Sequence, residues 1–145
     1  MIFVVDTSAI LKWFVEETDQ SHAHALLVAG TDLATPDFAL IEVANVLWRK
    51  QRLGDITETQ VDSAISDLPR FFGRRAPSAE LLAPALRLAR ELHHSVYDCM
   101  FLALAVALPD AMLVTADQRF LAKTRPSNHY RYLKPLADIP PVSEH

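Results

Sequence analysis

The chain has 145 residues, of which half are apolar and 22% are charged, and its formal net charge is −4. Its three glycines form neither a GxGxxG nor a P-loop phosphate motif. The single cysteine, Cys99, excludes an internal disulfide and a multi-cysteine zinc site. A chain of this kind fits one globular domain that buries roughly 70% of its unfolded surface. We expect that domain over residues 1–135, followed by an extended tail over 136–145.

The acidic net charge does not by itself favour nucleic-acid binding. Basic residues are nevertheless grouped, and each group is either a patch that binds a phosphate backbone or a solvated helix end. The groups are Arg49, Lys50 and Arg52; Arg70, Arg74 and Arg75; and Arg119, Lys123, Arg125, Arg131 and Lys134. No signal peptide is recognisable, and the longest apolar run, 100–108, is far shorter than the ~20 residues of a membrane helix. We therefore expect a soluble, cytoplasmic protein that does not bind membranes.

The first predicted element is a strand over residues 2–5. This run is continuous, apolar and rich in β-branched residues, which is typical of a strand buried on both faces. Apolar residues at helical spacing then predict a helix over 9–14, and a second helix is expected over 20–29. A short strand follows at 33–35 and ends at Pro36, which has no backbone N–H to donate.

The middle of the chain is predicted to be largely helical. The longest helix covers 38–53 and ends at Gly54, a residue that favours helix termination. The next helix begins after Thr57, with Gln60 at the position that completes a capping box. Residues 71–76 are a weaker strand candidate.

The last part of the chain alternates helices with strands. Residues 78–93 have helical periodicity, and 97–108 are nearly all apolar, which indicates a buried helix. A second buried strand is predicted at 111–116, a short helix after Asp117, and an edge strand at 130–133. This alternation predicts a three-layer α/β/α sandwich around a central, mainly parallel sheet.

Four acidic residues are predicted to meet at one edge of this sheet. Asp6 ends the first strand, and Asp117 follows the strand at 111–116. Asp98 begins the buried helix that leads into that strand, and Glu42 lies about one turn into the helix after the 33–35 strand. Because binding sites of open parallel sheets form at the carboxyl ends of the strands, we expect these four carboxylates to converge.

A structural interpretation competes for three of these acids. Asp6, Asp98 and Asp117 each stand where a helix starts, and aspartate is a favoured N-cap that also suits the positive end of the helix dipole. Glu42 is harder to explain in this way, because its neighbours are apolar and an unpartnered buried carboxylate is costly. Asn45, three residues further on, extends a polar stripe on the same helix face.

Four neighbouring carboxylates repel one another, so a positive group must offset them or some must stay protonated. We expect no basic partner for Asp98 among its sequence neighbours, and His22, His24, His93 and His94 follow no metal-ligand spacing tied to the acids. A divalent cation is therefore favoured. Oxygen ligands suit Mg²⁺ or Mn²⁺, and such a site suits hydrolysis of phosphodiesters.

The motifs that contain these acids are similar to those of one known family. The stretches "DTSAI", "EVANV", "YD" before the apolar helix and "TAD" after the late strand resemble the PIN-domain ribonucleases. The short length is most similar to VapC-type toxins of toxin–antitoxin pairs. The resemblance implies an α/β/α fold and RNA cleavage that depends on Mg²⁺ or Mn²⁺. It also implies that Asp6, Glu42, Asp98 and Asp117 are catalytic and bind the metal, and that Thr7, Ser8, Asn45 and Thr115 support them.

The resemblance also implies partners and leaves alternatives. We expect an RNA substrate, a cognate antitoxin that blocks the acidic pocket, and a homodimer. The alternatives are a stand-alone PIN nuclease in RNA processing and an inactive binding module of the same fold. A receiver-type signalling domain is disfavoured, because no lysine closely follows the strand "MLVT". Trp13, Phe14 and Trp48 are expected to be core or interface anchors.

Overall fold

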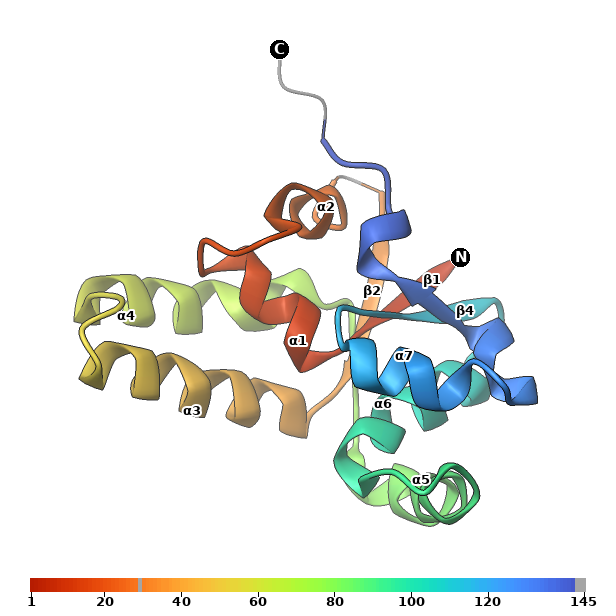
Figure 1. The fold of residues 1–145 in the computed structure, drawn as a ribbon. Helices are drawn as coiled ribbons and strands as arrows, with labels where there is room; N and C mark the ends of the chain where they lie inside the picture. Colours follow the sequence, from red (N-terminus) through yellow and green to blue (C-terminus); the bar gives the residue numbers. More distant parts are fainter. Residues whose placement is uncertain (29, 143–145) are drawn as a thin grey trace.

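A five-stranded sheet runs through the middle of the molecule in the computed structural model, which describes residues 1–28 and 30–142 (Figure 1). Every pair of neighbouring strands is parallel, and the strand order is β3-β2-β1-β4-β5. The strands are β1 (Ile2–Val5), β2 (Asp32–Pro36), β3 (Arg74–Ala76), β4 (Ala111–Thr115) and β5 (Leu133–Pro135). The predicted parallel sheet is confirmed, and β1 is its central strand.

The helices lie on both sides of this sheet (Figure 1). They are α1 (Thr7–Ile10), α2 (Gln20–Ala25), α3 (Phe38–Arg52), α4 (Glu58–Asp67), α5 (Ser78–Leu92), α6 (Val96–Ala107) and α7 (Gln118–Thr124). α6 packs against β1, β2 and β4, and α5 packs against α6. Residues 99–105 of α6 are all buried, which confirms the predicted apolar helix and explains why Cys99 is inaccessible. The result is the three-layer α/β/α arrangement expected from the sequence.

The register of the central strands positions the site. Val5 of β1 pairs with Val114 of β4, so Asp6 and Thr115 follow at the same edge of the sheet. On the other side of β1, the buried Thr35 of β2 donates its hydroxyl to the carbonyl of Val5 at 3.1 Å. The carboxyl ends of the three middle strands are therefore fixed relative to one another by backbone pairing and by a side-chain hydrogen bond.

Several predicted boundaries differ from the structure near the ends of the chain. The predicted edge strand at 130–133 is mostly a 3₁₀ helix over Asn128–Tyr132, and the strand begins only at Leu133. The Ser127 hydroxyl accepts a hydrogen bond from the N–H of His129 at 3.2 Å, and this cap starts a helical turn where the aromatic pattern had suggested a strand.

The predicted tail is also shorter than expected. Leu136–Asp138 form a 3₁₀ helix, and Leu136 and Ile139 are buried in the core, because these apolar side chains have a surface to pack against. The prediction that residues 136–145 are extended is therefore wrong for this part. Residues 143–145 lie outside the described residues.

Three further elements are shorter than predicted. The expected helix at 9–14 is one turn of α-helix, α1, continued by a 3₁₀ turn over Leu11–Trp13. α2 ends at Ala25, short of the predicted 20–29, of which residue 29 is not among those described. The strand expected at 71–76 is reduced to β3, because a 3₁₀ turn over Leu68–Phe71 precedes it.

The aromatic anchors have different environments. Trp13 is buried, packs edge-on against Phe71 at 5.4 Å between ring centroids, and donates its indole N–H to the carbonyl of Ala23 at 2.8 Å. Phe14 stacks on Phe71 and stays partly exposed. Trp48 is 49% exposed on α3, so only Trp13 is a core anchor. Across 1–28 and 30–142, no helix combines the length and the apolar character needed to span a membrane.

Candidate active site

Asp6 is the buried centre of the candidate site. It follows β1 directly and caps α1, with its Oδ1 accepting the N–H of Ala9 at 3.1 Å and the hydroxyl of Ser8 at 2.6 Å. Its Oδ2 accepts the hydroxyl of Thr115. Asp6 is therefore an N-cap, as one interpretation predicted, and three donors also fix the orientation of its carboxylate.

The predicted supporting hydroxyls form a connected network around this carboxylate. Ser8 also accepts the N–H of Ala116 at 3.0 Å, and Thr115 accepts the N–H of Asp117 at 3.0 Å. Each hydroxyl thus donates to Asp6 and accepts from the backbone just after β4. The start of α1 and the end of β4 are held together by these bonds, and the hydroxyl hydrogens are directed at the Asp6 oxygens.

Glu42 reaches the site from α3. Its Oε1 accepts the Thr7 hydroxyl at 2.7 Å, and among the described residues no donor is recorded for its Oε2. Asn45, which we expected to share the polar stripe, is exposed and does not hydrogen-bond to Glu42. The structure therefore brings Glu42 and Thr7 together but leaves Asn45 at the surface.

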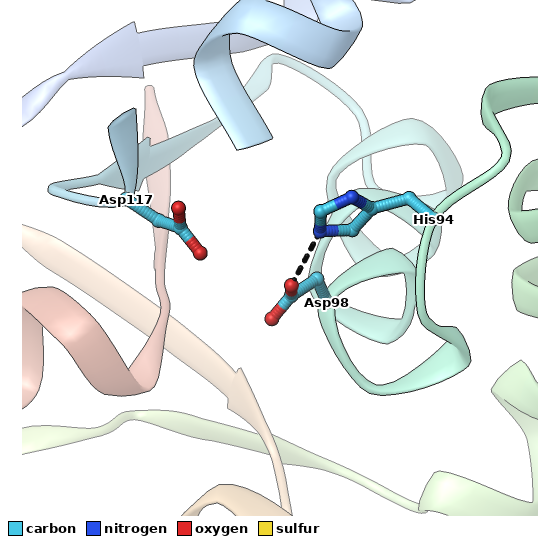
Figure 2. A group of neighbouring side chains, drawn as sticks. All are labelled: His94, Asp98 and Asp117. Carbon is cyan, nitrogen blue, oxygen red and sulfur yellow. Dashed lines mark hydrogen bonds and ion pairs between the residues drawn. The ribbon is translucent and has the colours of Figure 1, made fainter. Parts of the chain in front are cut away.

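Asp98 lies in the first turn of α6 and is not its cap. Ser95 caps this helix, accepting the N–H of Asp98 at 3.3 Å. The Asp98 carboxylate instead faces His94, whose Nε2 lies 2.6 Å from Oδ2 (Figure 2). The expectation that Asp98 has no basic partner nearby in sequence is wrong, because His94 precedes it by four residues and the turn before α6 brings the ring back to it.

Asp117 approaches from the opposite side. It caps α7, with Oδ1 accepting the N–H groups of Arg119 and Phe120 at 3.0 and 3.1 Å. Its carboxylate is directed toward Asp98 and His94 (Figure 2). One ligand atom from each of these three residues lies within 4.8 Å of the other two.

The electrostatics show that the other two acids belong to the same cluster. Burial raises the pKa of the Asp6 carboxyl from 3.8 to about 6, although the hydrogen bonds from Ser8, Thr115 and Ala9 act to lower it. Burial also raises the pKa of Glu42, against the bond from Thr7. The negative charge of Asp98 contributes to both increases. All four predicted acids therefore lie near one another, because Asp98 interacts with Asp6 and Glu42 and has a carboxylate oxygen within 4.8 Å of one of Asp117.

An open cavity of about 610 Å³ gives access to Asp98 and Asp117. Its lining combines acids and bases: Asp98 and Asp117 on one side, His93, His94 and Ser95 from the turn before α6, and Ala89, Arg119 and Lys123 from the flanking helices. The basic residues of α7 were recognised in the sequence only as one group among three. Their spacing of four residues from 119 to 123 places both on the face beside Asp117.

The donor set fits a divalent cation. Carboxylate oxygens and an imidazole nitrogen are metal ligands, and a positive ion would offset both the repulsion among the acids and the unfavourable burial of Asp6. Asp98 and Asp117 present oxygens to the open cavity, whereas both Asp6 oxygens already accept protein donors. His94 is the member of the cluster that our sequence argument missed, and its separation of four residues from Asp98 was the available signal.

Known proteins resemble this chain in sequence and in fold. The PIN domain family model matches residues 3–125. Ribonuclease VapC3 of Pyrobaculum aerophilum is 34% identical over 125 residues, which cover 85% of this chain and 95% of that protein. Ribonuclease VapC3 of Mycobacterium tuberculosis is 32% identical over 126 residues, which cover 87% of this chain and 89% of that protein. The crystal structure of PAE2754 from Pyrobaculum aerophilum has the same fold, with a TM-score of 0.68 at 23% identity over 94% of this chain and 85% of that one.

The chain therefore belongs to the PIN-domain family, and within it to the VapC-type proteins.

The raised pKa of Asp6 predicts how the metal-free protein responds to pH. Between pH 3.8 and about 6 the native state retains a proton that the unfolded state has lost, so the free energy of unfolding falls as the pH rises through this window. We expect a loss on the order of 2 kcal/mol in wild type, with Glu42 acting in the same direction, and a smaller loss in Asp6→Asn. Urea titrations in chelator at pH 4, 5, 6 and 7 measure it. Parallel pH dependence of the two proteins would contradict the assignment.

Proposed function

We propose that this chain is a metal-dependent endoribonuclease that acts as the toxin of a toxin–antitoxin pair, with Asp6, Glu42, Asp98 and Asp117 as its catalytic acids. The main support is that Asp6, Glu42 and Asp117 all lie near Asp98, and that Asp98 and Asp117 share an open cavity with the basic residues of α7. The relatives named ribonuclease support RNA as the substrate. An RNA substrate would place its action in the cytoplasm.

Asp98 and Asp117 are the acids best placed to hold Mg²⁺ or Mn²⁺, with Asp6 and Glu42 close by. When bound, the ion supplies positive charge for the phosphate and lowers the pKa of a water molecule. Thr115 and Ser8 hold Asp6 in one orientation. A carboxylate fixed in this way needs no reorganisation when the substrate binds.

Glu42 is suited to accept a proton from the attacking water. Its Oε1 is occupied by the Thr7 hydroxyl, while Oε2 remains available, and its raised pKa makes it a better base than an ordinary glutamate. Water rather than the RNA 2′-hydroxyl is then the nucleophile. The products would carry 5′-phosphate and 3′-hydroxyl ends.

Arg119 and Lys123 are proposed to bind the RNA backbone. Both line the cavity that contains Asp98 and Asp117, and both lie on the exposed face of α7. Their charges lie next to the acids, so a phosphate group drawn to α7 would be presented to the catalytic cluster. An acidic protein can bind RNA in this way through a local basic surface.

The chemistry is tested by Asp98→Asn, a substitution that removes one charge and keeps the shape. We expect the rate of RNA cleavage in Mn²⁺ to fall at least about a hundredfold, because an electrostatic contact to the reacting groups is lost. Asp62→Asn on the exposed face of α4 is the matched control and should retain full activity. Mass spectrometry of the products identifies their ends. A 2′,3′-cyclic phosphate, or equal cleavage by Asp98→Asn, would contradict the mechanism.

The RNA surface is tested by Arg119→Ala and Lys123→Ala. Each should raise KM for a single-stranded RNA several-fold with little change in kcat. The slope of log binding constant against log salt concentration should become shallower by about one for each phosphate contact that is removed. Arg125→Ala is the control, because Arg125 belongs to the same basic group but lies over the Tyr130 ring, outside the cavity lining. If the three variants bind RNA equally, α7 does not bind the backbone.

A cognate antitoxin is proposed to cover the site and a neighbouring groove. A cavity of about 660 Å³ lies between Phe14, Glu17, Lys50 of α3 and Gln60 of α4, and could receive a peptide segment. Trp13, one of the expected core or interface anchors, is buried and not available to such a segment. An arginine from the same segment could reach the acids, because its forked donors engage two carboxylates at once.

This partner is tested with the product of the neighbouring gene. We expect it to co-purify with the chain, and we expect one arginine-to-alanine change in it to restore most RNA cleavage. Substitution of its lysines is the control. If binding and inhibition survive every arginine change, the mechanism of inhibition is wrong; if no neighbouring product binds, the protein is a stand-alone nuclease.

A homodimer is proposed through an apolar surface next to the site. Phe38, Leu82, Tyr97 and Met100 surround a hollow of about 210 Å³, and Leu82 and Tyr97 are 55% and 66% exposed. Large exposed apolar side chains gathered in one place are typical of an interaction surface. Tyr97 immediately precedes Asp98, so a second copy bound here would bring the two active sites close to each other.

A further inference from the structure

Among the residues that the structure describes, His94 is the only histidine that hydrogen-bonds to an acid of the candidate site. It lies in the turn between α5 and α6. His93 ends α5 in the left-handed conformation, with φ 52°, and the N–H of His94 then donates to the carbonyl of Ala89 at 3.2 Å. The backbone of His94 is therefore fixed by the end of one helix and directed toward the start of the next.

The ring of His94 is also held in place. It packs against Phe120, with 4.9 Å between ring centroids, and Phe120 is fully buried on α7. The N–H of Phe120 is one of the two that Asp117 caps. The turn of α7 that orients Asp117 thus also supports the imidazole, and only 14% of the His94 side chain is exposed.

Nε2 is the ring atom that faces the acids. In Figure 2 it points to Asp98, while Asp117 faces the same space from the other side. Ligand atoms of the three residues all lie within 4.8 Å of one another. Two ligands on opposite sides of an ion, with bonds of about 2.1 Å, are about 4.2 Å apart. Adjacent ligands with such bonds are about 3 Å apart, so the 2.6 Å between Nε2 and Asp98 Oδ2 has to widen slightly. The widest separation in the cluster has to shorten by less than about an ångström, and one ion then fits among the three residues.

We propose that His94 Nε2 is a ligand of the divalent ion together with Asp98 and Asp117. This nitrogen makes the site prefer Mn²⁺ to Mg²⁺. The inference rests on the proposed metal-dependent function. Mg²⁺ is bound mainly by oxygen, whereas imidazole is a ligand for transition metals. Coordination uses the neutral tautomer with its proton on Nδ1, so the hydrogen bond between Nε2 and Asp98 is replaced by two bonds to the ion.

The simpler interpretation is that His94 only orients Asp98 by hydrogen bonding. Under that interpretation Nε2 keeps its proton and no nitrogen binds the ion. The two interpretations differ in a spectroscopic signal that does not depend on catalysis, because a directly bound imidazole nitrogen couples magnetically to Mn²⁺.

The experiment is pulsed EPR of the untagged, Mn²⁺-loaded protein, at natural abundance and after labelling of histidine with ¹⁵N. The variants are His94→Asn and, as matched control, His93→Asn, since asparagine tolerates the left-handed backbone of position 93. Calorimetric titration with Mn²⁺ and with Mg²⁺ gives the metal preference. Cleavage of a test RNA is measured on the same samples.

We expect a ¹⁴N coupling in wild type and His93→Asn that changes with ¹⁵N labelling and is lost in His94→Asn. The ratio of Mn²⁺ to Mg²⁺ affinity should fall at least about tenfold in His94→Asn alone. If wild type binds Mn²⁺ and cleaves RNA without a nitrogen coupling, the ligand assignment is wrong and the proposed function stands. If the coupling is present but no RNA is cleaved, the proposed function is wrong and His94 remains a ligand. If wild type binds no Mn²⁺, both are wrong.

Discussion

The hydrogen bond between the Thr115 hydroxyl and the Asp6 carboxylate joins the ends of the two central strands, and the rest of the site is arranged around it. Parallel pairing of β1 with β4 brings the two residues to the same edge of the sheet. A buried carboxylate without donors would be strongly unfavourable, so the neighbouring positions carry hydroxyls. Among the described residues, every buried side-chain nitrogen and oxygen has a hydrogen-bond partner. The sheet therefore holds an acid in its interior without leaving it unpaired.

The site concentrates negative charge where helices begin. Asp6 caps α1, Asp117 caps α7, and Asp98 lies in the first turn of α6. The partial positive charge of these N-termini, together with Arg119 and Lys123, offsets part of the repulsion among the acids. The offset is incomplete, because Asp98 still raises the pKa of both Asp6 and Glu42. The open cavity therefore still lacks positive charge, which a bound cation would supply. Sites that gather like charges in this way commonly lower the stability of the folded protein.

The sequence was sufficient to predict the parallel sheet, its central strand and the convergence of the four acids. Continuous runs of β-branched residues identify buried strands. Because sites in a parallel sheet form at the carboxyl ends of its strands, Asp6 and Asp117 are then placed at one edge. This placement also shows why the cap and site interpretations do not exclude each other, since helix N-termini and strand ends meet at that edge. For Asp6 and Asp117 the cap interpretation is confirmed, and both residues also lie in the candidate site.

Other features depend on contacts that the local pattern does not contain. His94 belongs to a turn, and its approach to Asp98 depends on the left-handed backbone of His93 and on the support of Phe120 from a distant helix. Leu136 and Ile139 are buried because the core offers them space, although they fall in the part of the chain that we expected to be an extended tail. Asn45 lies three residues after Glu42, a spacing that predicts the same helix face, but it is exposed at the surface. Spacing alone does not determine which side of that face a residue occupies.

The proposed chemistry depends on a catalytic cation held by Asp98 and Asp117 at the open end of the sheet, close to Asp6 and Glu42. Crystals soaked in Mn²⁺ and measured at the manganese absorption edge test it most directly, because the anomalous signal locates the ion without reference to activity. We expect a peak between the carboxylates of Asp98 and Asp117, within bonding distance of both. A well-diffracting soaked crystal with no peak there, or with its peak at a site away from these acids, would contradict it.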